Sequence, residues 1–163
     1  MPQAKKKATG ADRTDAISLL MQDHREVEDM FKEFEKAKKN EDDEAKSAIV
    51  KRVCAALTAH AEIEEEIFYP AVRGEIEDDD TMDEAEVEHG SIKNLVGQLE
   101  DLDPSDSFYD AKMTVLSEYV KHHVKEEEGE MFPKVKKAGI DLAALGAELM
   151  DRKREVEKTQ DAA

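Results

Sequence analysis

Several residue types are scarce in this 163-residue chain, which has one cysteine, no tryptophan, four prolines and seven glycines. A single cysteine, Cys54, cannot form an internal disulfide, so we expect a protein of a reducing compartment. Few glycines and prolines, with many Glu, Lys, Ala and Leu residues, favour helices. Leu, Ile, Val and Phe number only 33, which places the composition at the edge of intrinsic disorder.

Basic residues and long apolar runs are also scarce. There are 24 Lys and Arg residues against 41 Asp and Glu residues, and the formal net charge is −17. This charge repels phosphate backbones, so we expect no nucleic-acid partner. No apolar stretch reaches the ~20 residues that span a bilayer, and none follows the basic start of the chain. We therefore predict a soluble cytoplasmic protein without a membrane partner.

Helical periodicity begins near Thr14 and continues almost to the end of the chain. Apolar residues three or four positions apart predict four long helices, over 14–38, 42–69, 82–101 and 107–137. The acidic stretch 75–84 is predicted to be a loop. Four amphipathic helices with short connections predict an all-α fold, an antiparallel up-down-up-down four-helix bundle with a short C-terminal fifth helix.

The predicted domain organisation has four parts. They are a disordered basic tail over 1–13, the four-helix bundle over 14–138, a C-terminal docking helix over 139–158 and a disordered tail over 159–163. The fifth helix carries Leu142, Leu145 and Leu149 on one side, so we expect it to dock on the bundle or on a second copy. The predicted oligomeric state is a monomer or a weak homodimer.

Six polar residues occupy positions where the helical stripes would normally carry apolar side chains. They are His24 on the first helix, His60 and Glu64 on the second, His89 on the third, and His123 and Glu127 on the fourth. An internal repeat relates them, because residues 60–70 (HAEIEEEIFYP) align without gaps on residues 123–133 (HVKEEEGEMFP). Upstream, DHREV (23–27) resembles EHGSI (88–92). The repeat predicts two helical hairpins that bring two equivalent half-sites together.

Helical spacing predicts that these side chains meet inside the bundle. Residues four apart on a helix face the same way, about one 5.4 Å turn apart, so His60 and Glu64 point inward together, as do His123 and Glu127. Burying carboxylates without partners is very costly, whereas cations would satisfy them. Two first-row metal ions that share the two glutamates as bridges would satisfy every group. Imidazole and carboxylate ligands suit iron, zinc or manganese, and Ala61 after His60 rules out an HExxH protease motif.

Three further polar residues lie beside the expected site. His122 is about 100° round the helix from His123, so we expect it to be exposed. Glu65 and Glu128 each follow a predicted bridging glutamate, and we expect them to be solvated or to accept hydrogen bonds from imidazole N–H groups.

Three more residues, Glu86, Tyr119 and Cys54, have chemistry that could contribute to the site. Glu86, three residues before His89, is the best candidate for an additional carboxylate ligand. Tyr119 lies one turn before His123, and we expect it to pack rather than to reach the site. Cys54 lies off the histidine stripe, and we expect a half-buried, inert thiol.

The combined pattern, DH…H-x3-EE…YP…EH…H-x3-EE…FP, resembles the hemerythrin family in its bacterial HHE cation-binding form over residues 14–136. The resemblance implies a cofactor of two non-haem iron ions, bridged by two carboxylates and an oxo or hydroxo group. Carried over, the ligands would be His24, His60, Glu64, His89, His123 and Glu127. Oxygen-carrying members have a fifth histidine four residues from the first on the third helix, where this chain has Ala85 and Lys93. The resemblance therefore implies one more open iron position than in the oxygen carriers.

Three functions remain open from the sequence. The first is a di-iron protein that binds or reduces O2, peroxide or nitric oxide, so that its partner is a small diatomic or peroxide ligand. The second is an iron-binding, iron-sensing or iron-donating module without turnover, for which the acidic stretch after residue 75 would attract cations. The third is a metal-free helical interaction domain.

Overall fold

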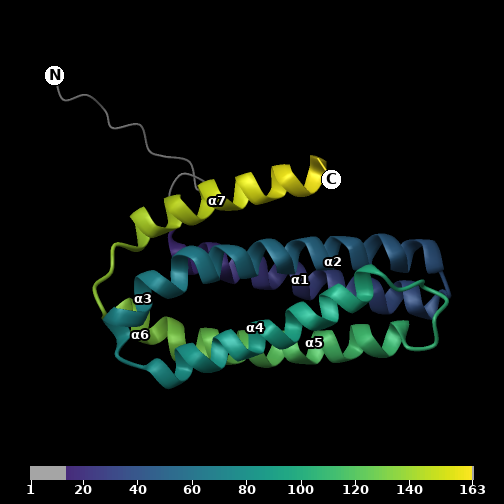
Figure 1. Cartoon of the computed structure of the whole chain (residues 1–163), viewed down its shortest axis with the longest axis horizontal. Coiled ribbons are helices and arrows are strands. Elements are labelled where there is room, and N and C mark those ends of the chain that lie inside the picture. Colours follow the sequence, from purple (N-terminus) through teal and green to yellow (C-terminus); the bar gives the residue numbers. More distant parts are fainter. Residues whose placement is uncertain (1–13, 163) are drawn as a thin grey trace.

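The computed structural model describes residues 14–162, which are almost entirely helical (Figure 1). The predicted basic tail, residues 1–13, lies outside the described residues. Seven α-helices follow one another: α1 (Ala16–Lys39), α2 (Asp43–Ile63), α3 (Tyr69–Ile76), α4 (Asp79–Glu100), α5 (Tyr109–Glu126), α6 (Phe132–Lys137) and α7 (Leu142–Ala162). No strand occurs between residues 14 and 162, which confirms the all-α prediction.

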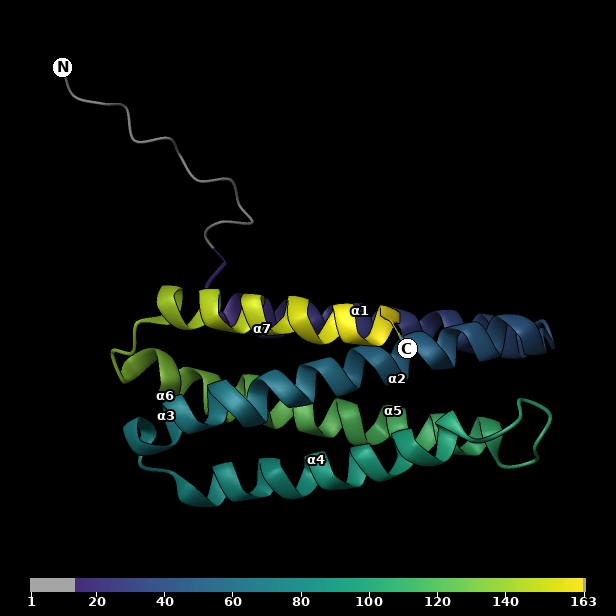
Figure 2. The ribbon, with the colours of Figure 1, turned by 45° about the horizontal axis from the view of Figure 1, so that its top comes forward.

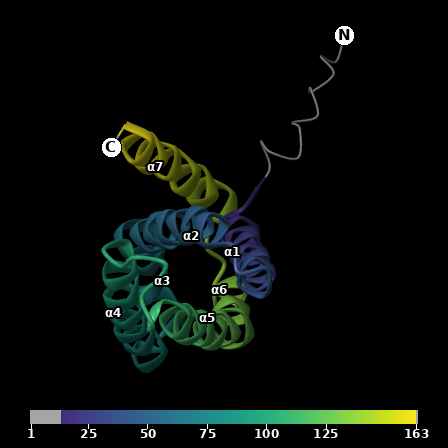
Figure 3. The ribbon, with the colours of Figure 1, turned by 90° about the vertical axis from the view of Figure 1, so that its right-hand side faces the viewer.

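Four long helices surround a common core. Figure 3 shows α1, α2, α4 and α5 side by side around the bundle axis, and each contacts the next in the order α1, α2, α4, α5 and back to α1. The fifth long helix, α7, lies outside this ring against α1 and α2 (Figure 2). None of the helices within residues 14–162 has the length and apolarity needed to cross a membrane.

Aspartates stand at the start of several helices, where they stabilise the helix ends. Part of the acidic excess of the chain is explained in this way. Asp15, Asp42, Asp78 and Asp141 each accept a hydrogen bond from the backbone N–H three residues further on. This contact satisfies one of the free N–H groups at a helix start, and the negative charge suits the positive end of the helix dipole.

Each second helix of the repeat continues through a proline by way of a π-helical turn. Five-residue π segments, Glu64–Phe68 and Glu127–Met131, join α2 to α3 and α5 to α6 without a break. The N–H of Tyr69 bonds to the carbonyl of Glu64, five residues back, and Phe132 bonds to Glu127 in the same way. A proline with no N–H to donate follows each of these residues, and the widened turn accommodates it. From the sequence, Pro133 predicted a kink or break in the helix over 107–137. The prediction of a break is wrong, because the chain stays helical through Pro133.

The predicted acidic loop over 75–84 is also wrong. Helix α3 runs to Ile76 and α4 begins at Asp79, so only Glu77 and Asp78 connect them. Glu77 takes a left-handed conformation with φ of 50°, which turns the chain within two residues. Asp79 and Asp80 lie in the first turn of α4, where negative charge is favourable.

Two apolar layers fill the bundle, and the polar stripe residues lie between them. One layer surrounds Phe34, Val53, Val96 and Leu116, and the other, toward α3 and α6, surrounds Leu20, Phe68, Met82 and Phe132. On each of the four long helices a candidate histidine falls between the residues of one layer and those of the other. The polar residues thus form a slab with apolar packing on both sides.

Helix α7 docks through a close approach to the start of α1. A Cβ at Gly146 would lie 2.5 Å from the carbonyl oxygen of Thr14, so only glycine permits this contact. Leu145 and Leu149 are buried beside it, as predicted for the docking side, while Leu142 is half-buried. The helix extends to Ala162, so residues 159–162, predicted as a disordered tail, continue the helix instead.

Candidate metal centre

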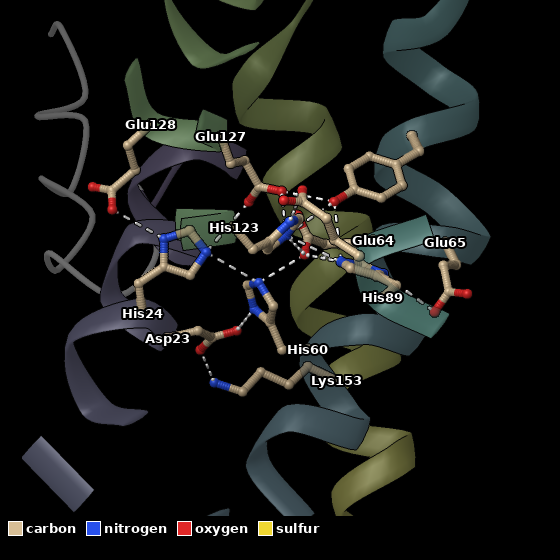
Figure 4. Close-up of polar contacts among 12 residues, drawn as sticks. Asp23, His24, His60, Glu64, Glu65, His89, His123, Glu127, Glu128 and Lys153 are labelled. Carbon is tan, nitrogen blue, oxygen red and sulfur yellow. Dashed lines mark hydrogen bonds and ion pairs between the residues drawn. The ribbon is translucent and has the colours of Figure 1, made fainter. Parts of the chain in front are cut away.

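The structure brings all six predicted site residues together in the slab between the apolar layers (Figure 4). Each is at least nine-tenths buried. They come from four helices and both π segments: His24 (α1), His60 (α2), Glu64 (first π segment), His89 (α4), His123 (α5) and Glu127 (second π segment). Both glutamates are the first residues of their π segments, and π-helical turns in proteins frequently occur at functional sites.

The histidines form two facing pairs, one from each half of the repeat. The Nε2 atoms of His24 and His60 lie 3.2 Å apart, as do the Nε2 atoms of His89 and His123. When two neutral imidazoles face each other through their Nε2 atoms, only one of them can donate an N–H to the other. Each pair therefore requires a further binding partner. Nitrogen lone pairs converging on one point are the arrangement that a bound cation requires.

The two glutamates each reach both histidine pairs. Glu127 places Oε1 3.3 Å from the Nε2 of His24 and Oε2 3.1 Å from the Nε2 of His123. Glu64 places Oε1 2.8 Å from the Nε2 of His60 and 3.3 Å from that of His89. Two groups within bonding distance of one cation result, one of Glu64, His89, His123 and Glu127, the other of His24, His60 and Glu127. Glu127 belongs to both groups, and Glu64 contacts a histidine of each, so both carboxylates lie between the two histidine pairs.

The buried carboxylate oxygens require positive charge. Both oxygens of Glu64 and Oε1 of Glu127 are fully buried without a hydrogen-bond partner. Burial alone raises the pKa of Glu64, yet the charge of His60 and the neighbouring imidazoles hold it well below its usual range. Such oxygens are costly unless protonated imidazoles or a cation face them. The donor set of four imidazole nitrogens and two carboxylates therefore fits a pair of first-row metal ions.

The imidazoles respond to the same carboxylates. Burial lowers the pKa of His60, but Glu64 and Asp23 raise it overall to about 10. Burial likewise lowers the pKa of His123, and contacts with Glu127, Glu64 and Glu88 raise it overall to about 12. Metal binding would displace these protons.

Each clustered histidine turns its other ring nitrogen toward a carboxylate next to a site residue. The Nδ1 of His60 faces Asp23 at 2.9 Å and that of His123 faces Glu88 at 3.0 Å. The corresponding contacts are His24 to Glu128 at 3.2 Å and His89 to Glu65 at 3.5 Å, the last too long for a hydrogen bond. The prediction that residues 65 and 128 accept from imidazoles is thus confirmed for Glu128. Contacts of this kind fix the ring orientation of metal-binding histidines.

Four residues that contribute to the site were not predicted from the sequence. Asp23 and Glu88 each precede a site histidine, and this acid-before-histidine repeat was the signal that could have identified them. Lys153 of α7 bonds to the Oδ1 of buried Asp23 at 2.7 Å (Figure 4). The hydroxyl of Tyr69 donates to the Oε2 of Glu127 at 2.7 Å. Its repeat equivalent is Phe132, so the Tyr-for-Phe difference was a second available signal.

Four expectations at the edge of the site can now be compared with the structure. Glu86 does not join the cluster; its exposed carboxylate accepts from Arg73 at 3.0 Å, so the additional-ligand prediction is wrong. His122 is exposed, as predicted, and Tyr119 is 45% exposed and away from the cluster. Cys54 is fully rather than half buried. Burial, with Glu100 nearby, raises its pKa to about 12, which keeps the thiol inert.

The fold and the site define a helical bundle protein with a buried histidine and glutamate cluster suited to cations. The sequence model of the family described as hemerythrin HHE cation binding domain matches residues 15–135. The chain therefore belongs to the hemerythrin HHE cation-binding family, and α7 lies beyond the matched region.

Two known proteins are similar to the chain. A DNA nickase from Nostoc sp. (strain PCC 7120) is 30% identical over 129 residues, which are 78% of this chain and 36% of that protein. The chain thus spans about a third of the length of this relative. The crystal structure of a hemerythrin HHE cation binding domain-containing protein from Mycobacterium kansasii superposes with a TM-score of 0.77 at 20% identity. It covers 90% of this chain and 89% of the other, and shows the same fold.

Proposed function

We propose that this protein holds two non-haem iron ions, bridged by Glu64, Glu127 and an oxo or hydroxo group, and binds or reduces O2, peroxide or nitric oxide. The observation that supports the proposal is that two buried carboxylates, both oxygens of Glu64 and Oε1 of Glu127 lacking hydrogen-bond partners, are shared between two facing histidine pairs. The ligands would be His24, His60, Glu64, His89, His123 and Glu127. When bound, the iron pair would supply open coordination positions and reversible electron transfer to a small ligand.

The chain's own residues would hold and tune that centre. The four imidazoles supply neutral nitrogen ligands, and the carboxylates turned toward their Nδ1 atoms fix the rings and raise their basicity. Tyr69 holds the Oε2 of Glu127 by a hydrogen bond, which restricts how that carboxylate can rotate. Apolar layers pack against the centre on both sides. We place this chemistry on the predicted antiparallel up-down-up-down bundle, in a cytoplasmic protein without nucleic-acid or membrane partners.

Metal analysis with a UV–visible spectrum of protein purified without chelator tests the proposal. We expect two irons per chain and a near-UV charge-transfer band after aerobic reconstitution. His123→Ala and Glu127→Ala should lose metal and the band, because each removes a ligand. Full metal content and an unchanged spectrum in both variants would overturn the assignment.

Two further measurements separate the alternatives. More than two irons retained per chain through gel filtration, without peroxide turnover, would favour iron storage or donation over reaction. A thermal melt unchanged by chelator would favour a metal-free interaction domain. We expect chelator to lower the melting temperature markedly, because a ligand of the folded state stabilises it by RT ln(1 + [L]/Kd).

A further inference from the structure

A cavity of about 380 Å³ leads away from the histidine cluster between α2 and α4. Its inner end is formed by the four clustered histidines. Its walls carry the apolar side chains of Val27, Leu57, Ile92, Val96, Val120 and Val124. Its outer end reaches residues that are exposed or half-buried, namely Thr58 and Glu62 of α2 and Lys93, Gly97 and Glu100 of α4. The cavity therefore connects the site with the surface along an apolar path.

The size of this space exceeds what a diatomic molecule or hydrogen peroxide needs. One water molecule takes up about 30 Å³ of the liquid, so the cavity corresponds to roughly thirteen times that volume. Pockets for organic ligands begin at about 300 Å³. An apolar space of this size lowers the stability of a bundle unless something fills it. The volume and the lining together indicate a ligand with an apolar body.

The charges around the cavity restrict the polar end of such a ligand. Asp23, Glu62 and Glu100 line the cavity. Glu64 and Glu127 lie behind the histidines, so carboxylates near both ends disfavour an anionic group. Lys93, the cation at the outer end, is held by Glu65 at 2.6 Å. The four histidine rings make the inner end the polar end of the cavity, although their nitrogens already face one another and the neighbouring carboxylates.

We propose that the cavity binds an aliphatic molecule with a small uncharged polar head, the head toward the histidines and the tail along the valines. Primary alcohols and alkyl hydroperoxides belong to this class. An alkyl hydroperoxide would bring a peroxide group to the candidate centre, and that extension rests on the proposed function. Binding of the tail depends on the cavity alone.

Calorimetric titration of the protein as purified with 1-butanol, 1-hexanol and 1-octanol tests the cavity with redox-inert probes. We expect saturable binding at one site, with each added methylene tightening Kd about threefold to fourfold, because each buries roughly the same apolar area. Absence of saturable octanol binding, or an affinity independent of chain length, would overturn the proposal.

Two glycines of α4 provide a matched pair of variants. Gly97 and Gly90 are both exposed, and a Cβ at either would meet nothing within 4 Å, but only Gly97 lines the cavity. Gly97→Leu should weaken octanol binding about tenfold or more, as expected for the loss of roughly two buried methylenes. Gly90→Leu should change it by less than about twofold. Equal effects of the two variants would place the octanol elsewhere and overturn the proposal.

Metal content measured on the same samples separates this proposal from the proposed function. A sample that binds octanol but retains no metal would keep the cavity assignment and remove the di-iron one. A sample with two irons per chain that binds no octanol would keep the di-iron assignment and remove the cavity assignment.

Discussion

The two halves of the repeat supply matching inner groups but obtain their outer support from different places. In the first half, His60 faces Asp23, which is held by Lys153 from α7. In the second half, His123 faces the Oε1 of Glu88. The other oxygen of Glu88 lies 3.2 Å from the Nε2 of His122, which precedes His123 on α5.

The difference shows that a repeat can be symmetric where it faces the centre and asymmetric behind it. Asp23 is almost fully buried and paired with a lysine that stays charged, so its charge is locked in place. Glu88 is partly exposed, and its partner His122 is 64% exposed and in contact with water. The first half is therefore rigidly supported from outside the repeat, whereas the second is supported by a solvated side chain.

The aromatic residues of the repeat, in contrast, give the additional support to the second half. Tyr69 lies against His89 of the second half and donates its hydroxyl to Glu127, while Phe132 stacks on His24 of the first half at 6.2 Å between ring centroids. Each half thus covers a histidine of the other, but only the second half receives a hydrogen bond in doing so.

The largest expected difference between the two halves is the loss of metal affinity in Lys153→Met compared with that in His122→Ala. Without its lysine, buried Asp23 keeps only His60 as a partner, so we expect metal affinity to fall about tenfold, at the lower end of outer-partner effects. His122→Ala should cost less than about twofold, because its contacts are exposed. Competition with a metal-binding indicator measures both affinities. Far-UV circular dichroism checks that α7 remains helical, and equal losses in the two variants would contradict the asymmetry.

A smaller effect is expected from exchanging the aromatic residues. Tyr69→Phe removes a buried hydrogen bond to a carboxylate, and we expect the free energy of unfolding to fall by about 1 kcal/mol in urea titrations. Phe132→Tyr places a hydroxyl beside His24 and serves as the counterpart. Should Tyr69→Phe leave the unfolding midpoint unchanged, the hydrogen bond contributes nothing to the second half.

The smallest effect concerns the ion pair that ties α6 to α4. Contacts with Lys134 and Thr81 lower the pKa of Asp78 to about 2, and the repeat equivalent of Lys134 is Ala71, which offers no such contact. Because this pKa is depressed, the stabilisation is present above about pH 4, the unfolded value, and is lost as pH falls toward about 2. Asp78→Asn keeps the helix cap but removes the charge. Its urea midpoint should lie slightly below that of the wild type at pH 7, and the gap should narrow below pH 4.

Sequence reasoning located the inner site because helical spacing is a local property. His60 and Glu64 are still joined by α-helical geometry, since the π segment begins only at Glu64. Beyond it the extra residue shifts the register. Phe68 is therefore buried, whereas Ile67, which lies three residues after Glu64 and would share its face in a regular α-helix, is half-buried. Glu86 was misplaced because spacing relative to His89 says nothing about Arg73, which captures its carboxylate.

The outer support could not be predicted in the same way. Lys153 is one of 24 basic residues, and no period relates it to Asp23, from which 130 positions separate it. Its position depends on how α7 docks, and that depends on the close approach at Gly146. Tertiary contacts of this kind leave no local pattern in the sequence.

The π-helical turns limit how the length of this chain can change. The widened turn holds one residue more than an α-helical turn, so deleting one residue between Glu64 and Phe68 would restore α-helical geometry there and leave the following side chains of α3 facing as they do now. Tyr69 would still face Glu127. The proline after Tyr69 would, however, stand in an α-helical turn, where its ring clashes with the carbonyl four residues back. The connection over residues 101–108, which contributes nothing to the candidate centre, can gain or lose residues without that penalty.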